Sequence, residues 1–532
     1  MVTRVLQTLR VSALTALALA VMAGGVRAQS PQTPAVPSGP LTLEQVLTLA
    51  EARSESVGIA QVAVTRTEGD AVRARAAERP QLSAAASYDR SLANEFQGVF
   101  DNVNFGNGSS DGTSDGGSLK DLPFGRANTW RATLSFSQSL YSGGRVGVQK
   151  QLAGLGRTSA EQALVGARAQ LRFDVTQAYY DALLSERLVT IAQATLDQAG
   201  ATLKQTQAGL DAGTQPEFEV LRATVSRDNQ TPVLIRQRAN RDVAMLRLKQ
   251  LLELPADYDL RLADDLGDPR LAPAPVFAER VAPVESALRT VSSVSVSLPG
   301  APIPERNAVA EAGTVVSLRE AALKAVEAER QPSVSLTSNY SRIAYPSGAL
   351  PTFDRANWSI GVSMSVPILT GGRQKGDEML ARADIETARL QQKQVQELAG
   401  LDTRSAWAEL VAARAAWEAT AGTVQQANRA YEIADVRYRA GVSTQLELSD
   451  SRLLLQQAEA NRALAARDLQ VARARVALLP ELPLGAGTAT GGARPATSQG
   501  AQPQAPPQQQ QQGRSQFANA AAQQGQSQTG TR

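Results

Sequence analysis

The most reactive side chains available to proteins are missing, because the 532 residues include neither cysteine nor histidine. Thiol chemistry, disulfides, ordinary zinc sites and every histidine-based acid–base pair are therefore excluded. Carboxylates remain, and two of them follow glycines at one spacing: Glu219 stands six residues after Gly213, and Glu447 six residues after Gly441. No nucleophile–base pair or carboxylate cluster stands out from the helical periodicity. The sequence predicts a protein that is not an enzyme and has no cofactor or metal site.

The charge balance and the first residues narrow the class of protein further. The formal net charge is +3 and charged residues make up 20% of the chain, so no nucleic-acid partner is expected. Residues 1–28 have the pattern of a secretory signal peptide, with Arg4 and Arg10 before the apolar run Val11–Ala23. That run is shorter than the roughly 20 residues of a membrane-spanning helix, and no later segment qualifies. We expect no transmembrane helix in the mature protein.

An internal duplication organises the chain. Sliding the sequence over itself by 228 positions aligns more than a hundred residues without a gap, so that Trp130 falls on Trp358 and Gly213 on Gly441. The piece upstream aligns at a different offset, with Pro80 opposite Pro332. Each repeat is expected to read helix, strand, loop, strand, long helix, turn and helix.

The predicted boundaries follow from this alignment. The first repeat is expected over residues 29–255, a connector over 256–304, the second repeat over 305–480 and a disordered tail rich in Gln, Gly, Ala and Pro over 481–532. The expected strands are residues 81–90, 129–141, 333–342 and 357–369; the long helices are 145–212 and 373–440; the return helices are 217–252 and 445–479. Shorter helices, at about 57–79 and 307–330, are expected before each strand pair.

The strands and the long helices each show a regular apolar pattern. Leu134, Phe136 and Leu140 alternate with serines, as do Val362 and Met364, which suits lipid on one side and water on the other. An ordinary half-buried strand of a soluble protein has the same period, and that alternative stays open. Four strands cannot close a barrel, so a barrel would need several chains. The long helices carry heptads of larger residues, such as Leu410, Trp417, Val424, Tyr431 and Tyr438, beside heptads of smaller ones, such as Ala178, Ser185, Ala192, Ala199 and Thr206.

Taken together, several motifs resemble those of the TolC family of outer-membrane efflux and secretion channels. They are "LTLEQVLTLAEARS" at 41–54, "SGGR" at 142–145, "TGGR" at 370–373 and "RYRAGVSTQLELSD" at 437–450. The resemblance implies a mostly α fold with a small β part: a homotrimer whose strands form one β-barrel in outer-membrane lipid, continued by a coiled-coil α-helical barrel in the periplasm. The implied function is a passive exit duct of a tripartite efflux or type I secretion system, joined to a periplasmic adaptor and an inner-membrane pump.

The resemblance also implies site residues. Gly143, Gly144, Gly371 and Gly372 would form the strand–helix joints, where glycine suits the change of backbone direction. The periplasmic tip that meets the adaptor would contain Gly213, Thr214, Gly441, Val442 and Ser443. The aperture would be controlled by Glu219, Tyr438, Glu447 and Asp450, whose carboxylates would favour cations, with Tyr438 a partner for Glu219.

Two departures place the usual latch of the family in doubt, since Ser443 stands where its pattern has an arginine and Phe218 where it has a hydroxyl. A solvated helix face is an equally good explanation of the acidic residues, as is seam packing for Tyr438.

A second function remains to be weighed against the duct. A periplasmic adaptor or structural coiled-coil protein would also be rich in long helices, but adaptors lack a duplicated strand–Gly-Gly–helix joint. The sequence does not separate drugs, metals, other small molecules and proteins as cargo.

Overall fold

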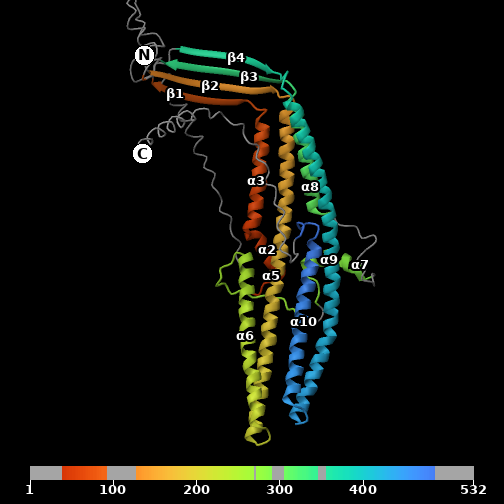
Figure 1. Ribbon diagram of the computed structural model, residues 1–532. Coiled ribbons are helices and arrows are strands. Elements are labelled where there is room, and N and C mark those ends of the chain that lie inside the picture. The colour runs from red at the N-terminus through yellow and green to blue at the C-terminus, as the bar shows by residue number, and fades with distance from the viewer. Residues whose placement is uncertain are drawn as a thin grey trace, which may run out of the picture. The chain divides into compact units, whose positions relative to one another are not determined.

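The computed structural model describes residues 39–90, 92, 128–268, 271–289, 305–344 and 355–485 (Figure 1). All of them belong to one compact unit, which clusters as residues 1–486. The predicted signal peptide and nearly all of the predicted tail lie outside the described residues. None of the helices in the described ranges is long and apolar enough to cross a membrane.

The order of elements follows the predicted repeat. The elements are α2 (Leu43–Arg53), α3 (Glu55–Ala76), β1 (Gln81–Arg90), β2 (Asn128–Tyr141), α5 (Arg145–Asp211), α6 (Glu217–Leu251), α7 (Pro275–Arg289), α8 (Asn307–Ala328), β3 (Ser333–Ala344), β4 (Arg355–Ser365), α9 (Arg373–Arg439) and α10 (Gln445–Leu478). Several boundaries differ from expectation, since β3 runs on to Ala344 and β4 begins at Arg355. The last strand ends at Ser365 instead of Leu369, because Pro367 has no N–H to donate and β3, its partner, begins opposite Ser365. The predicted connector contains a helix of its own, α7.

The four strands form one antiparallel sheet in the order β1-β2-β3-β4. Residues that lie opposite one another share a face, so the register sorts the side chains into two sets. One row across the sheet is Ala84, Leu134, Tyr340 and Trp358. The neighbouring row, on the other face, is Ser83, Ser135, Asn339 and Ser359. The predicted alternation is confirmed, except that a register shift between Ser139 and Tyr141 leaves Leu140 out of the pairing.

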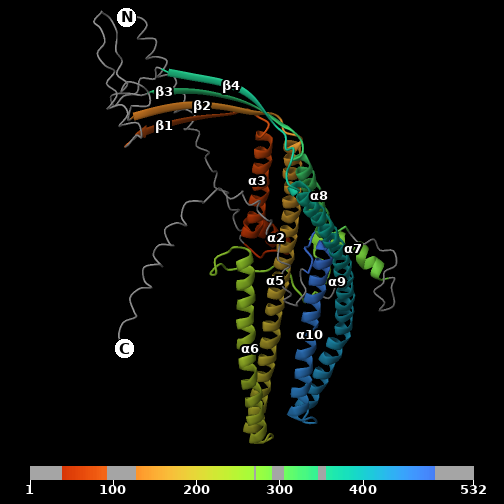
Figure 2. The same cartoon turned by 45° about the horizontal axis from the view of Figure 1, so that its top comes forward.

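Two helical hairpins extend from the strands, and shorter helices flank their upper parts (Figure 2). At about 1.5 Å per residue, the 67 residues of α5 and of α9 each span about 100 Å. α5 packs against α6, α3, α8 and α10, and α9 packs against α10 and α8. The predicted heptads face these partners: Leu410, Trp417 and Tyr438 are buried, as are Ala178, Ala192 and Ala199.

The principal core lies where α2, the connector and the ends of α6 and α10 meet α5. Val46, Tyr179, Leu248 and Leu252 are fully buried in it. The hydroxyl of Tyr179 donates to the Asp264 carboxylate at 2.8 Å, so the connector is tied to α5 by a part-buried polar contact as well as by apolar packing.

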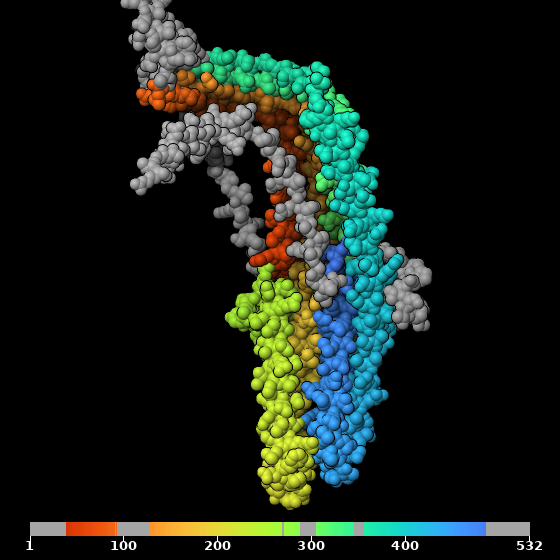
Figure 3. Space-filling view, in the orientation of Figure 1, coloured from red at the N-terminus to blue at the C-terminus, as the bar shows by residue number. Residues whose placement is uncertain are grey.

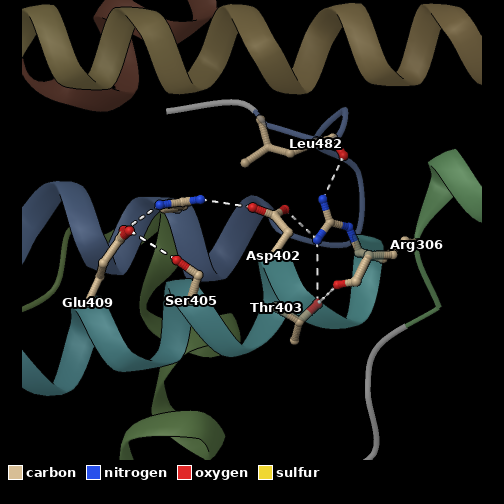
Figure 4. A network of polar contacts seen from close by, with 8 residues as sticks. Arg306, Asp402, Thr403, Ser405, Glu409 and Leu482 are labelled. Carbon is tan, nitrogen blue, oxygen red and sulfur yellow. Dashed lines mark hydrogen bonds and ion pairs between the residues drawn. The ribbon is translucent and has the colours of Figure 1, made fainter. Parts of the chain in front are cut away.

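A buried ionic network fixes the root of the second hairpin (Figure 4). Arg306, which precedes α8 and is 1% exposed, contacts the Asp402 carboxylate at 2.9 Å and donates to the Leu482 carbonyl at 3.1 Å. Arg475 of α10 contacts the other oxygen of Asp402 at 2.9 Å and also pairs with Glu409. One carboxylate on α9 thus joins α8, α10 and the chain after α10.

The first repeat lacks this arrangement at the matching place. Asp174, which aligns with Asp402, accepts a hydrogen bond from Gln170 at 2.8 Å, and burial raises the pKa of its carboxyl. Ser54, in place of Arg306, precedes the matching helix α3. Burial therefore disfavours the charged form of Asp174, whereas Asp402 lies between two arginine side chains.

We expect Asp402→Asn to lower the free energy of unfolding by about 3–5 kcal/mol, because two buried guanidinium groups lose their shared counter-charge. Asp174→Asn is the matched control and should change the free energy of unfolding little, since burial already disfavours the charged form of Asp174. Thermal unfolding in detergent, followed by circular dichroism, measures both. Equal losses in the two variants would contradict the assignment.

Candidate functional site: the strand–helix joints and the helical tips

Each strand–helix joint is made by two glycines in the left-handed conformation. Gly143 and Gly144 have φ of +62° and +83°, and Gly371 and Gly372 have +59° and +88°. Side-chain-bearing residues avoid this region, so both positions of each joint favour glycine. Three residues separate Tyr141 of β2 from Arg145 of α5, and seven separate Ser365 of β4 from Arg373 of α9. Gly143 is also crowded, since an added Cβ would lie 2.4 Å from the Cβ of Gln331.

At the opposite ends of the hairpins, the two tips turn in similar ways. Gly213 and Gly441 have φ of +71° and +73°. After the first, the Thr214 N–H donates to the Gly209 carbonyl at 2.8 Å; at the second, the Val442 N–H donates to the Arg437 carbonyl at 3.0 Å. These bonds satisfy carbonyls that the ends of α5 and α9 would otherwise leave unpaired.

The predicted aperture residues lie close together near these tips, but their partners differ from expectation. The hydroxyl of Tyr438 is buried and lies 2.9 Å from the hydroxyl of Thr206 on α5. Within the single chain Tyr438 thus pairs with Thr206, and its pairing with Glu219 stays a prediction. Tyr438 lies on the α9 seam, and its ring packs with Ala434 and Leu448 while its hydroxyl reaches the other hairpin.

Glu219 instead meets Gln445, the first residue of α10. With its amide nitrogen turned toward the acceptors, Gln445 donates to the Glu219 carboxylate at 2.8 Å and to the Glu219 carbonyl at 3.1 Å. Its own oxygen then accepts from the Ala223 N–H at 3.1 Å. This contact joins α6 to α10, and the Gln445 side chain that makes it is only 2% exposed to solvent.

A third contact lies deeper between the same two helices. Arg452 of α10 is buried and donates to the hydroxyl of Ser226 on α6 at 2.7 Å. Burial lowers the pKa of this guanidinium. We call the three pairs Thr206–Tyr438, Glu219–Gln445 and Ser226–Arg452 the interhairpin contacts.

Glu447 has its own cation within the second tip. Its carboxylate lies 3.1 Å from the Arg437 guanidinium and accepts from the Ser443 hydroxyl at 2.8 Å. Where the family pattern has an arginine at position 443, this chain supplies the positive charge one turn before the glycine. Asp450 is exposed on the next turn of α10.

Sequence reasoning missed Thr206, Ser226, Gln445 and Arg452. The signal that could have found them lies in the repeat itself, because each differs in character from its equivalent 228 positions away. Those equivalents are Ala434, Leu454, Glu217 and Thr224. Polar residues that break an internal repeat on a packed face are candidates for contacts between its halves.

With this geometry in hand, comparison with known proteins decides the family. The model of the outer membrane efflux protein family matches residues 46–253 and 303–480. The chain belongs to this family. Its members are proteins of the outer membrane, and this membership decides against a periplasmic adaptor.

The relatives agree with this assignment. The outer membrane efflux protein BepC of Brucella suis is 26% identical over 301 residues, which span 55% of this chain but only 61% of BepC. The pyoverdine export outer membrane protein OpmQ of Pseudomonas aeruginosa is 24% identical over 432 residues, or 78% of this chain and 80% of OpmQ.

Solved channels share the fold. VceC of Vibrio cholerae superposes with a TM-score of 0.60 at 18% identity, over 82% of this chain and 96% of VceC. The open state of the MtrE channel of Neisseria gonorrhoeae gives 0.61 at 19% identity, over 86% and 96%. The predicted TolC-like fold class is confirmed.

Alanine substitutions at the joints test the role of glycine. Gly371→Ala, which has free space around it, should cost about 1–2 kcal/mol for the left-handed backbone alone. Gly143→Ala should cost more, because its Cβ would also collide with Gln331. Gly147→Ala, inside α5 and unobstructed, is the control and should be neutral or stabilising by up to about 1 kcal/mol. Thermal midpoints that rank otherwise would refute this account of the joints.

Proposed function

We propose that three copies of this chain join to form a passive exit duct, through which solutes delivered by an inner-membrane pump and a periplasmic adaptor leave across the outer membrane. The observation that carries the proposal is the sheet. Among the described strands, β1 and β4 each have only one neighbour, and one face of the sheet is apolar and exposed. A sheet of this kind is complete only when other copies pair with both edges.

The two faces of the sheet suit lipid and water. Along β4, Trp358, Ile360, Val362 and Met364 are 66–74% exposed in the single chain. Such a row would be costly in water but is favourable against lipid tails. The opposite face, with Ser335 and Ser363 hydrogen-bonded to each other, suits a water-filled interior.

The interhairpin contacts would hold the duct closed at its periplasmic end. They join α5 to α9 and α6 to α10 near the tips, so the hairpins can separate there only if these contacts break. The neutral Thr206–Tyr438 bond contributes about 0.5–1.5 kcal/mol, and the bonds to the charged Glu219 and Arg452 about 1.5–3 kcal/mol each, weak enough for a partner protein to break.

The tips themselves offer a docking surface for the adaptor. Gly213, Thr214, Gly441 and Val442 are exposed, and Phe218 on the first turn of α6 is 64% exposed. Exposed apolar groups beside turn backbone are typical of protein-binding surfaces. Choice of cargo would then lie with the pump.

Single-channel recording tests the proposal. The purified chain should form pores in lipid bilayers, and electron micrographs should show a central tunnel. A Tyr438→Phe variant removes one hydroxyl of the buried contact and leaves the Thr206 hydroxyl without its partner on the other hairpin. At about 1 kcal/mol per copy, the loss over three copies should raise the open probability more than tenfold. Solid particles without conductance would end the proposal; an unchanged open probability would remove this pair from the gate.

Ion selectivity tests the carboxylates separately. Asp450→Ala should lower the cation-to-anion permeability ratio, because a ring of three charges is lost. Glu447→Ala should lower it further, since Arg437 is left uncompensated. Glu386→Ala, on an exposed part of α9 far from the tip, is the control and should have no effect. Unchanged reversal potentials in both tip variants would place these carboxylates outside the conduction path.

A further inference from the structure

An aromatic pair and an arginine lie together at the end of the sheet that is far from the helices. Tyr88 of β1 stands directly opposite Trp130 of β2, and the centroids of their rings are 4.7 Å apart. Arg90 follows Tyr88 by two residues, so it lies on the same face of the sheet and about 7 Å further from the helices. Its side chain is exposed and has no hydrogen bond or ion pair with any described residue.

The second repeat builds the same arrangement on β3 and β4. Tyr340 stands opposite Trp358, and Arg342 follows Tyr340 by two residues. The Arg342 Nε–H donates to the Tyr340 hydroxyl at 2.8 Å, while the terminal N–H groups of this guanidinium have no partner among the described residues. Arg342 is exposed, so these N–H groups are available to an external acceptor.

The two sets occupy equivalent places in the duplicated chain. The tyrosines and the arginines coincide when Pro80 is set opposite Pro332, and the tryptophans coincide at the offset of 228. Each arginine stands nine residues after the first residue of its strand, Gln81 or Ser333, so both lie at the same distance along their strands. We call the sets Tyr88–Arg90–Trp130 and Tyr340–Arg342–Trp358 the aromatic–arginine units.

The arginines of these units are the only charged side chains on the exposed apolar face of the four described strands. The charged residues Asp89 and Arg131 stand at a similar level but point to the opposite face. A charge is costly among lipid tails, so arginines confined to one end of the face mark the level at which tails give way to headgroups. Tyr and Trp side chains are enriched at the same level.

The direction of the strands decides which headgroups these are. α3 leads into β1 and β2 leads back into α5, so the aromatic–arginine units lie at the end of the sheet opposite the helices (Figure 3). In the proposed duct the helices lie on the periplasmic side, which places this end in the outer leaflet. Among the described residues, this face offers no carboxylate to neutralise the two guanidinium groups.

We propose that each aromatic–arginine unit binds a phosphate-bearing lipid of the outer leaflet, with the arginine paired to the phosphate and the Tyr–Trp pair packed against the first part of the acyl chains. A guanidinium suits this role because its planar N–H groups bind two phosphate oxygens at once. The inference rests on the proposed function, in which this face of the sheet meets lipid, and it adds the chemical class of that lipid.

Binding of lipid A to the purified full chain in detergent tests the proposal. Native mass spectra should show up to two lipid A molecules retained per copy, one for each unit. Lipid A whose phosphates have been removed enzymatically should be retained far less, because the arginines lose their counter-charge. Inorganic phosphate at the same concentration should neither bind nor raise the thermal midpoint, because it lacks the acyl chains that pack on the aromatic pair.

Variants then assign the binding to the arginines. Arg90→Gln together with Arg342→Gln should weaken lipid A binding about tenfold or more per site, since each charge-assisted bond is lost. Arg90→Lys with Arg342→Lys should restore part of the affinity, because the charge returns without the planar fork. Arg131→Gln is the matched control: it removes the same charge from the opposite face and should leave the affinity unchanged.

The outcomes separate this inference from the proposed function. Equal retention of the dephosphorylated lipid would overturn the proposal, because apolar contact alone would then explain binding. Stabilisation by inorganic phosphate would make the units general anion sites, and an equal loss in Arg131→Gln would point to overall charge; either result would overturn it too. In all three cases, pores with normal conductance in bilayers would leave the duct standing. Lipid A retained without any pore would remove the duct and leave the lipid sites.

Discussion

Unpaired backbone groups at the edges of the sheet set the constraint on which the rest of the architecture depends. The outer N–H and C=O groups of β1 and β4 need partners, and lipid offers none. One chain cannot supply them, because its four described strands already pair in a single order. The edges belong to strands that continue into α3, α5 and α9, so any pairing between copies also dictates how the helices below are arranged.

The two-glycine joints transmit that constraint from sheet to helix. Gly143–Gly144 turn the chain from β2 into α5 within three residues, whereas seven residues that end in Gly371–Gly372 separate β4 from α9. A looser connection would let the hairpins move independently of the sheet. The two glycine pairs thus lie at one end of the hairpins and the interhairpin contacts at the other.

Duplication supplies the scaffold, and departures from it supply the function. Both repeats have long helices of 67 residues and turns with a left-handed glycine. Their side chains differ at the root of the second hairpin and at the tips. Arg306 and Asp402 pair at the root of the second hairpin, whereas Asp174 in the first accepts a hydrogen bond from Gln170 and pairs with no buried arginine there. At the tips, Thr206 and Gln445 form bonds that their equivalents, Ala434 and Glu217, would not reproduce in the same form.

The buried apolar packing of the hairpins decreases from the root to the tips. The root combines a continuous apolar core with buried ion pairs, while the buried apolar cluster at the second tip consists of Ala434, Tyr438 and Leu448. Regions with few buried contacts open at low free-energy cost. The contacts near the tips can therefore break while the root stays intact.

The sequence by itself determined the elements, their order and their faces. Alternation located the apolar side of the sheet, heptads located the seams of α5 and α9, and the repeat located the joints and tips to within a few residues, because each of these patterns is local. Only the tertiary structure decided that Tyr438 bonds with Thr206, that Glu219 meets Gln445, and that Asp402 joins two arginines. These partners are 73 to 232 residues apart in the chain. Local periodicity tells which face of a helix is packed, but the residue met on the neighbouring helix depends on the relative height and rotation of whole hairpins.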